Sequence, residues 1–230
     1  MSASTDSVPL RILCIHGYRQ NSGSFRDKTG ALRKLLKKQV EWVYMTAPHS
    51  VPQRTEVVQE QDQKEIARDE EDPRGWWFSD VQARSFNAGQ VCEASLGLEE
   101  SLEAVKKAVK ELGPFDGILG FSQGAALVAM VCALQEHNVP SDFQFRFAIL
   151  VAGFRSACAQ HEKFYTGTTL TIPSLHVFGQ KDNVISDSLS RELLPRFENP
   201  MVLTHPGGHF VPAASAHRQT YQEFLSRFHK

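Results

Sequence analysis

The segment Gly120-Phe121-Ser122-Gln123-Gly124 constrains the fold of this chain more than any other part of the sequence. A short apolar run precedes this segment, and the apolar stretch from Ala125 to Leu134 follows it. This order predicts a buried strand, a tight turn with Ser122 at its apex, and a helix, which is the G-x-S-x-G nucleophile elbow. Such a turn lifts the serine hydroxyl clear of the backbone, and the flanking glycines let strand and helix approach closely. Free N–H groups at the start of the helix stabilise negative charge beside the serine.

Apolar strand-like runs alternate with helical patterns along the rest of the chain. Besides the strand before the elbow, strands are predicted at residues 9–15, 41–45, 146–151, 173–178 and 201–204, and helices at 24–38, 98–112, 125–134 and 212–228. The strands show little polar alternation, which is typical of parallel strands covered on both faces. The pattern predicts an α/β fold with a doubly wound, mostly parallel sheet and right-handed crossovers. We find no linker or internal repeat, so residues 1–230 are expected to form a single domain.

One part of the chain departs from this alternation. Residues 51–72 are rich in Gln, Glu and Asp and predict a polar surface insertion. Residues 73–97 form a second excursion, which carries the adjacent aromatics Trp76, Trp77 and Phe78 outside any periodic element. These aromatics either pack the insertion onto the body of the protein or wall a pocket, and the two interpretations are compatible.

The bulk composition argues against several classes of function. A formal net charge of −1 gives no support for a nucleic-acid-binding or membrane-docking surface. No apolar run reaches the roughly 18 residues that span a bilayer, so no stable membrane insertion is expected. The first residues show no secretory signal, and the scattered Cys14, Cys92, Cys132 and Cys158 are expected to be free thiols. These features indicate a reducing compartment, the cytoplasm with the nucleus as a second location. They leave the oligomeric state undetermined.

Ser122 needs a base to take its proton and an acid to orient that base. In this type of sheet the acid follows the serine in the chain and the histidine follows the acid. Asp182 and Asp187 both come after the predicted strand at 173–178. Asp182 is favoured because it lies in a turn close to the strand end, whereas Asp187 could equally cap the next helix.

Four histidines follow these acids. His217 and His229 belong to the closing helix and its end, and His205 falls at a strand terminus. His209 follows two glycines on a loop, where its ring can reach the elbow, and it is the favoured base. We expect activity to fall on the acid side of neutrality as such a histidine is protonated.

The remaining candidates line the same predicted edge of the sheet. The backbone N–H groups of Tyr18 and Gln123 are expected to form an oxyanion hole, with His16 shaping the loop that carries Tyr18. A zinc site made by His16, Asp182 and His209 is disfavoured, because no zinc-binding motif supports it. No zinc site is therefore expected.

Several motifs together resemble the FSH-type eukaryotic serine hydrolases. They are Leu-Cys-Ile-His-Gly-Tyr-Arg-Gln near the start, Arg-Gly-Trp-Trp-Phe at 74–78, the segment 113–124 around the elbow, His-Val-Phe-Gly at 176–179 with Asp182, and Gly-Gly-His-Phe-Val-Pro at 207–212. The resemblance spans the chain from about residue 9 to residue 228. It implies an α/β-hydrolase fold, a triad of Ser122, Asp182 and His209, no cofactor, and hydrolysis of carboxylic esters with long acyl chains.

The sequence therefore predicts a serine esterase that works through an acyl-enzyme. Its small-molecule substrate is expected to lie against an apolar pocket rim formed, beside Tyr18, by Trp76, Trp77, Phe154, Val184 and Phe210. Such a rim favours medium to long acyl chains. The alternatives are a thioesterase or lactone hydrolase that uses the same triad, and a ligand-binding protein built on a hydrolase scaffold.

Overall fold

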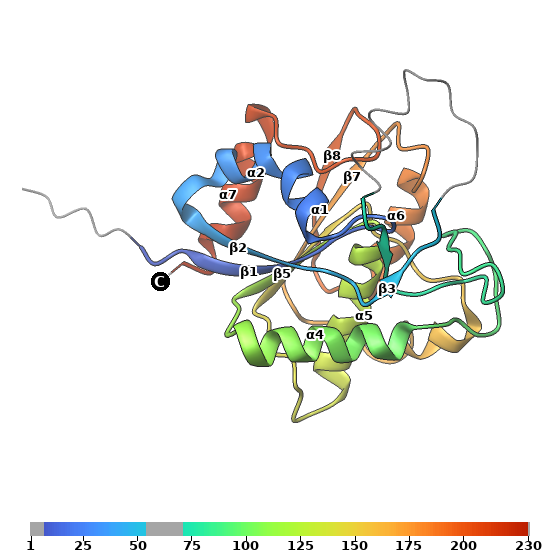
Figure 1. Cartoon of the computed structure of the whole chain (residues 1–230). Coiled ribbons are helices and arrows are strands. Elements are labelled where there is room, and N and C mark those ends of the chain that lie inside the picture. Colours follow the sequence, from blue (N-terminus) through green and yellow to red (C-terminus); the bar gives the residue numbers. More distant parts are fainter. Residues whose placement is uncertain (1–6, 54–70, 230) are drawn as a thin grey trace, which may run out of the picture.

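A six-stranded parallel sheet forms the centre of the protein, with the strand order β2-β1-β5-β6-β7-β8 (Figure 1). The computed structural model describes residues 7–53 and 71–229, so most of the polar insertion expected at 51–72 lies outside the described residues. The strands are β1 (Leu10–Ile15), β2 (Val40–Met45), β5 (Gly117–Phe121), β6 (Phe147–Val151), β7 (Ser174–Gly179) and β8 (Met201–His205). The α/β class, the parallel sheet and the strand positions are as the sequence predicts.

Helices cover both faces of this sheet, which explains why its strands are so apolar. Helices α1 (Ser22–Lys28), α2 (Gly30–Leu36) and α7 (Arg218–Ser226) lie on one face, while α4 (Leu98–Leu112) and α5 (Gln123–His137) lie on the other (Figure 1). Every residue of β5 and β6 is buried between the two layers. Helix α6 (Asp187–Leu193) packs beside β7. Since all strands run the same way, their carboxyl ends meet at one edge of the sheet, where sites form in folds of this kind.

The helix predicted over residues 24–38 is wrong in one respect, because the chain forms two helices there. The break lies at Thr29, between α1 and α2, and a 3₁₀ turn at Lys37–Gln39 follows α2. The hydroxyl of Thr29 donates to the carbonyl of Phe25 at 2.8 Å and also contacts the hydroxyl of Tyr44. A threonine hydroxyl that bonds to the preceding turn, followed by the flexible Gly30, favours a break over a continuous helix.

The closing helix is also shorter than the predicted span of 212–228. A 3₁₀ turn at Ser215–His217 comes first, and α7 begins at Arg218. The residues from Pro212 to Ala214 precede the helix, and the carbonyl of Pro212 accepts a hydrogen bond from the hydroxyl of Tyr221 at 2.7 Å. The predicted inner stripe is nevertheless correct, since Tyr221, Phe224, Leu225 and Phe228 are all buried.

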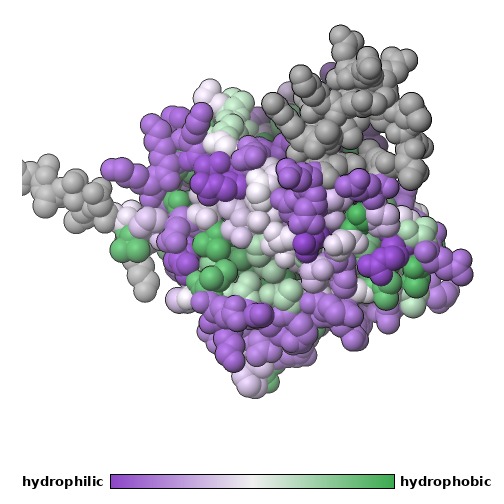
Figure 2. Space-filling view, viewed as in Figure 1, coloured by the Kyte–Doolittle hydropathy of each residue, from purple (hydrophilic) through white to green (hydrophobic). Residues whose placement is uncertain are grey.

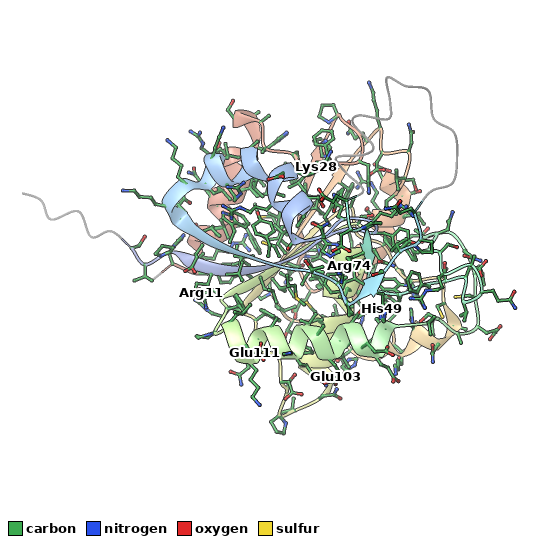
Figure 3. All side chains as sticks on the ribbon, in the orientation of Figure 1. Arg11, Lys28, His49, Arg74, Glu103 and Glu111 are labelled. Carbon is green, nitrogen blue, oxygen red and sulfur yellow. The ribbon has the colours of Figure 1, made fainter. Side chains whose placement is uncertain are left out.

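The aromatic excursion begins on a second, two-stranded sheet. Here β3 (His49–Ser50) pairs antiparallel with β4 (Arg74–Gly75), and Figure 3 shows the labelled His49 and Arg74 side chains in this region. Trp76 and Trp77 follow β4 directly and are 0% and 1% exposed. The remainder is a loop held by single bridges, such as the one between Phe78 and Leu96.

The outer surface over α4 is strongly polar, as Figure 2 shows in the hydrophilic band below the sheet. Helix α4 carries acidic residues in its first turn and Lys110 in its last turn, an order that suits the helix dipole. In the part of the chain that the structure describes, no helix is long and apolar enough to cross a membrane. All four cysteines are free thiols.

Candidate active site

Ser122 occupies a strained position between β5 and α5. Its φ of 56° and ψ of −118° lie outside the regions that residues with a side chain commonly adopt. The turn is held by a hydrogen bond from the N–H of Ser122 to the carbonyl of Val151 at 2.9 Å, on the neighbouring strand. The serine is 8% exposed, and α5 begins at the next residue. This is the strand, turn and helix order that the motif predicts.

The glycines of the motif are required by close backbone contacts. A Cβ atom on Gly120 would lie 2.4 Å from the carbonyl oxygen of Gly124. A Cβ atom on Gly124 would lie 2.3 Å and 2.4 Å from the carbonyl oxygens of Ile15 and His16. No side chain fits at these distances, so the start of α5 rests directly on the backbone at the end of β1.

The structure brings Asp182 and His209 together from two different loops. Nδ1 of His209 lies 2.7 Å from Oδ2 of Asp182, and the Asp182 side chain is 0% exposed. The other carboxylate oxygen of Asp182 accepts hydrogen bonds from the N–H groups of Val184 and Ile185, each at 2.8 Å. Both oxygens therefore have partners, and the orientation of the carboxylate is fixed.

The charge of Asp182 is stabilised by these partners. Burial by itself raises the pKa of Asp182, but the hydrogen bonds from His209 and from the Ile185 and Val184 amides outweigh it. The net result is a pKa below the ordinary value of an aspartate. Asp182 is accordingly ionised at neutral pH and can stabilise a positive charge on the His209 ring.

His209 also reaches the elbow. Its ring centroid lies 4.7 Å from that of Phe121, the residue immediately before Ser122. The two loops are joined by a hydrogen bond from the N–H of Lys181 to the carbonyl of Gly207 at 3.0 Å. A Cβ atom on Gly179 would lie 2.4 Å from that same carbonyl oxygen, so a glycine is needed there for the loops to meet.

The alternative acids and bases lie in other surroundings. Asp187 is in the first turn of α6 and pairs with Arg191 at 3.3 Å. His205 is buried at the end of β8, and its Nδ1 accepts a hydrogen bond from the N–H of Gly207 at 3.2 Å. Burial, followed by the nearby His217, lowers the pKa of His205. His217 lies in the turn before α7, and His229 lies beyond the end of that helix.

The loop after β1, which carries Tyr18, lies directly against the elbow. A Cβ atom on Gly17 would lie 3.2 Å from the Phe121 ring and 3.3 Å from its carbonyl oxygen. His16 shapes this loop, because its Nε2 accepts the N–H of Ala47 at 3.0 Å and its Nδ1 donates to the Gly17 carbonyl at 2.7 Å. Burial, which exceeds the effect of the Gly17 carbonyl, lowers the pKa of His16 to about 4. The ring is therefore neutral and structural.

The predicted pocket residues fall into different environments. Trp76 is fully buried in the hydrophobic core, and its indole N–H donates to the carbonyl of His16 at 2.8 Å. Val184 and Phe210 are 63% and 49% exposed on the two loops around Asp182 and His209. Trp77 and Phe154 line a narrow void that is too tight to admit a water molecule. The packing interpretation thus describes Trp76, and Trp77 and Phe154 are also closely packed, so they would wall a pocket only if the rings around this void moved apart.

Phe86 is a residue at this void that the sequence analysis did not identify. Its ring centroid lies 5.3 Å from Trp77, 5.8 Å from Phe154 and 5.4 Å from Tyr18. The four rings form an aromatic cluster between the Tyr18 loop and the void. Phe86 is the one aromatic between residues 79 and 97 of the excursion, which was a usable signal in the sequence.

The part of the chain that the structure describes contains no set of side chains suited to bind a metal ion. No group of three or more His, Cys, Asp or Glu side chains there could hold an ion. Both nitrogens of the His16 ring are engaged by the backbone.

Comparison with known proteins agrees with this architecture. The model of the family described as "Serine hydrolase (FSH1)" matches residues 4–221. A zebrafish (Danio rerio) protein named esterase OVCA2 is 70% identical over 224 residues, covering 96% of this chain and 99% of that protein. Its human (Homo sapiens) counterpart of the same name is 46% identical over 220 residues, covering 96% and 97%.

More distant solved structures share the fold. The crystal structure of Arabidopsis thaliana SOBER1 has a TM-score of 0.62 at 16% identity, covering 95% of this chain and 98% of that one. The crystal structure of Zea mays acyl-protein thioesterase 2 also has a TM-score of 0.62, at 17% identity, with 95% of each chain covered. At these identities the likeness concerns the arrangement of the sheet and helices.

Proposed function

The chain belongs to the FSH1 family of serine hydrolases, and from this we propose that it is an esterase in which Ser122, His209 and Asp182 hydrolyse carboxylic esters. The family resemblance seen in the sequence motifs is thereby confirmed. The assignment of catalytic roles to individual residues is our proposal.

Each residue has one role in the proposed reaction. The Oγ of Ser122 attacks the ester carbonyl carbon while Nε2 of His209 takes the hydroxyl proton. Asp182 keeps the proton of the neutral ring on Nδ1 and stabilises the imidazolium that forms. The proton then passes from His209 to the leaving alcohol, and an acyl-serine remains. Water, activated by His209, attacks the acyl group and releases the carboxylic acid.

Negative charge on the carbonyl oxygen is held by the N–H groups of Gln123 and Tyr18. Gln123 is the first residue of α5, so its N–H belongs to the group that has no partner within the helix. The helix dipole adds to this stabilisation. The loop of Tyr18 is supported as the second donor by its close contact with Phe121.

One observation carries this proposal. The buried Asp182 is hydrogen bonded to His209, and the His209 ring lies on Phe121, next to the strained Ser122. A binding protein would need no such arrangement, since a buried carboxylate aimed at a histidine has its use in proton transfer.

For the acyl chain we propose the aromatic cluster of Tyr18, Trp77, Phe86 and Phe154. Among the described residues, no charged side chain lines the void next to this cluster. These uncharged surroundings suit an alkyl chain of medium to long length, which would enter by moving the aromatic rings apart, because the void itself is too tight for a water molecule. Each buried methylene adds about 0.8 kcal/mol to binding. Thioesters and lactones remain alternative substrates, because the same attack and the same oxyanion occur with each.

A fluorophosphonate probe and a substrate panel test the proposal together. We expect the probe to label Ser122 and the protein to hydrolyse alkyl esters, while Ser122→Ala abolishes labelling and hydrolysis and keeps the melting temperature near that of the wild type. Thioester or lactone turnover in place of ester turnover would select the alternative. Labelling at another serine, or ligand binding without labelling or turnover, would overturn the proposed function.

A further inference from the structure

The side chain of Gln123 makes contacts that the role of its backbone N–H does not explain. Its Oε1 accepts the N–H of Trp76 at 2.9 Å, and its Nε2 donates to the carbonyl of Trp77 at 2.8 Å. Gln123 is 0% exposed, and both tryptophans are buried. A single side-chain amide thus holds the backbone of two consecutive residues that lie far away in the sequence.

Both contacts can be made only by a side chain with an amide group at position 123. The Trp76 N–H needs an acceptor, and the Trp77 carbonyl needs a donor, so a carboxylate satisfies only one of them. An apolar side chain of similar length satisfies neither and leaves two buried backbone groups without partners.

The same segment is tied to the loop that carries Tyr18. The indole N–H of Trp76 donates to the carbonyl of His16 at 2.8 Å. The backbone of Arg74, labelled in Figure 3, donates to the carbonyl of Gln20 at 3.0 Å and accepts from the N–H of Arg19 at 2.8 Å. The segment from Arg74 to Trp77 therefore bridges the elbow on one side and the loop after β1 on the other.

A further contact holds this bridge from behind. The hydroxyl of Ser101, on α4, donates to the carbonyl of Trp76 at 2.5 Å, and Ser101 is also buried. The Trp76 backbone and indole are then bonded on three sides, which leaves the segment little freedom to shift.

We infer that Gln123 is a positioning residue for the oxyanion hole. Through Trp76, its side-chain amide holds the backbone N–H at the elbow at a fixed distance from the loop that carries Tyr18. This inference rests on the proposed function, because it concerns the hole that the Gln123 and Tyr18 amides form. A hole made by two segments stabilises a transition state only if their spacing is held before the reaction begins. The Gln123 side chain and the Trp76 indole join those two segments.

Gln135 provides a matched control on the same helix. Its Oε1 accepts the N–H of Phe145 at 2.7 Å, and its Nε2 donates to the carbonyl of the same residue at 2.9 Å. The interaction is of the same chemical kind, but it lies near the far end of α5 from the elbow. Because the bonds of Gln135 are only partly buried, a merely structural effect should lower the melting temperature of both variants, more so for Gln123→Met, without a selective loss of kcat.

The experiment compares kcat and KM for an octanoyl ester with inhibition by an octyl trifluoromethyl ketone. Ser122 adds to this ketone, its proton passes to His209, and the resulting hemiketal oxyanion occupies the hole. We expect Gln123→Met to lower kcat and to weaken ketone inhibition in parallel, each by about 10- to 100-fold, with KM changed by less than about threefold. Gln135→Met should leave all three values within about twofold.

All measurements are made at a temperature where circular dichroism shows the variant folded. If Gln123→Met does not fold, Gln123→Glu and Trp76→Phe replace it. The first keeps the acceptor for the Trp76 N–H, and the second removes the indole N–H that bonds to His16 and makes a buried side chain smaller. Both should show the same selective loss of kcat and of ketone inhibition.

Wild-type kcat and ketone inhibition in these folded variants would overturn the inference, as would equal losses in Gln123→Met and Gln135→Met. Measurements on the wild-type protein distinguish this outcome from failure of the proposed function. If the wild type is neither labelled by a fluorophosphonate nor active on esters, the proposed function itself is wrong.

Discussion

Nδ1 of His209 lies 2.7 Å from Oδ2 of Asp182, and this contact joins two loops that are 27 residues apart in the chain. Because the Asp182 side chain is fully buried, replacement of its charge has no compensation from solvent. We expect Asp182→Asn to lower kcat about 10²- to 10⁴-fold, since an amide cannot stabilise the imidazolium or hold the correct tautomer. Steady-state kinetics of the purified variant on an ester substrate measures this effect.

Asp187→Asn is the control for that change. Asp187 is a partly exposed carboxylate in the first turn of α6, so its loss should cost only the weak pair with Arg191, below about 1 kcal/mol. Activity near that of the wild type is expected. If Asp187→Asn were the inactive variant and Asp182→Asn the active one, the assignment of the acid would be reversed.

Gly124→Ala should damage the site through the backbone. Its new methyl group would meet the carbonyl oxygens of Ile15 and His16 at 2.3 Å and 2.4 Å, and these atoms belong to β1 and its loop. Overpacking of this kind costs roughly 1–3 kcal/mol of stability, and the forced movement should also lower kcat. Gly89→Ala, whose methyl group would come no closer than 3.5 Å to its nearest neighbour, is the control. Thermal melts and kinetics that rank the two variants equally would contradict the structural account.

The acyl-chain proposal makes a prediction about Phe86. We expect kcat/KM of the wild type to rise from acetyl to octanoyl esters, and Phe86→Ala to flatten this rise more than it lowers acetyl turnover. Trp42→Ala removes a partly buried aromatic side chain on β2. This variant should lower kcat/KM by the same factor for esters of every acyl length. A wild-type profile that peaks at acetyl would show that the aromatic cluster is packing alone.

Acid should destabilise the fold through buried histidines. Burial lowers the pKa of His176 to about 3. Burial and the nearby Lys163 lower that of His161 to about 4, and the pKa of the buried His16 is also about 4. In the unfolded chain these groups titrate near pH 6.5, so between about pH 6.5 and pH 4 the unfolded state binds more protons than the folded state. Stability is therefore full above pH 6.5 and is lost as the pH falls through this window.

The depressed pKa of Asp182 acts in the same direction at lower pH. We expect the melting temperature to fall steadily from pH 7 to pH 4, and His176→Gln to make this fall shallower by removing one of the titrating groups. A melting temperature that is flat over this range, or an unchanged slope in the variant, would contradict the assignment of buried neutral histidines.

The sequence by itself determined the parallel sheet, the elbow and the expectation that motif glycines permit close packing. These features depend on local patterns: apolar runs predict buried strands, and a G-x-S-x-G between such a run and a helix leaves few other folds. The chain order of serine, acid and histidine further reduced the candidates for the site to a few residues.

Tertiary structure alone decided between neighbours that look alike in the sequence. Asp182 and Asp187 differ because one meets His209 and two backbone amides, while the other lies partly exposed in the first turn of α6 and pairs with Arg191. The break at Thr29 depends on the hydroxyl contacts of Thr29 in the folded state. The indole of Trp76 bonds to His16, and the side chain of Gln123 bonds to the backbone of Trp76 and Trp77. These contacts join residues 46 to 60 positions apart in the chain. Such partners are chosen by the geometry in which layers pack, which no local pattern records.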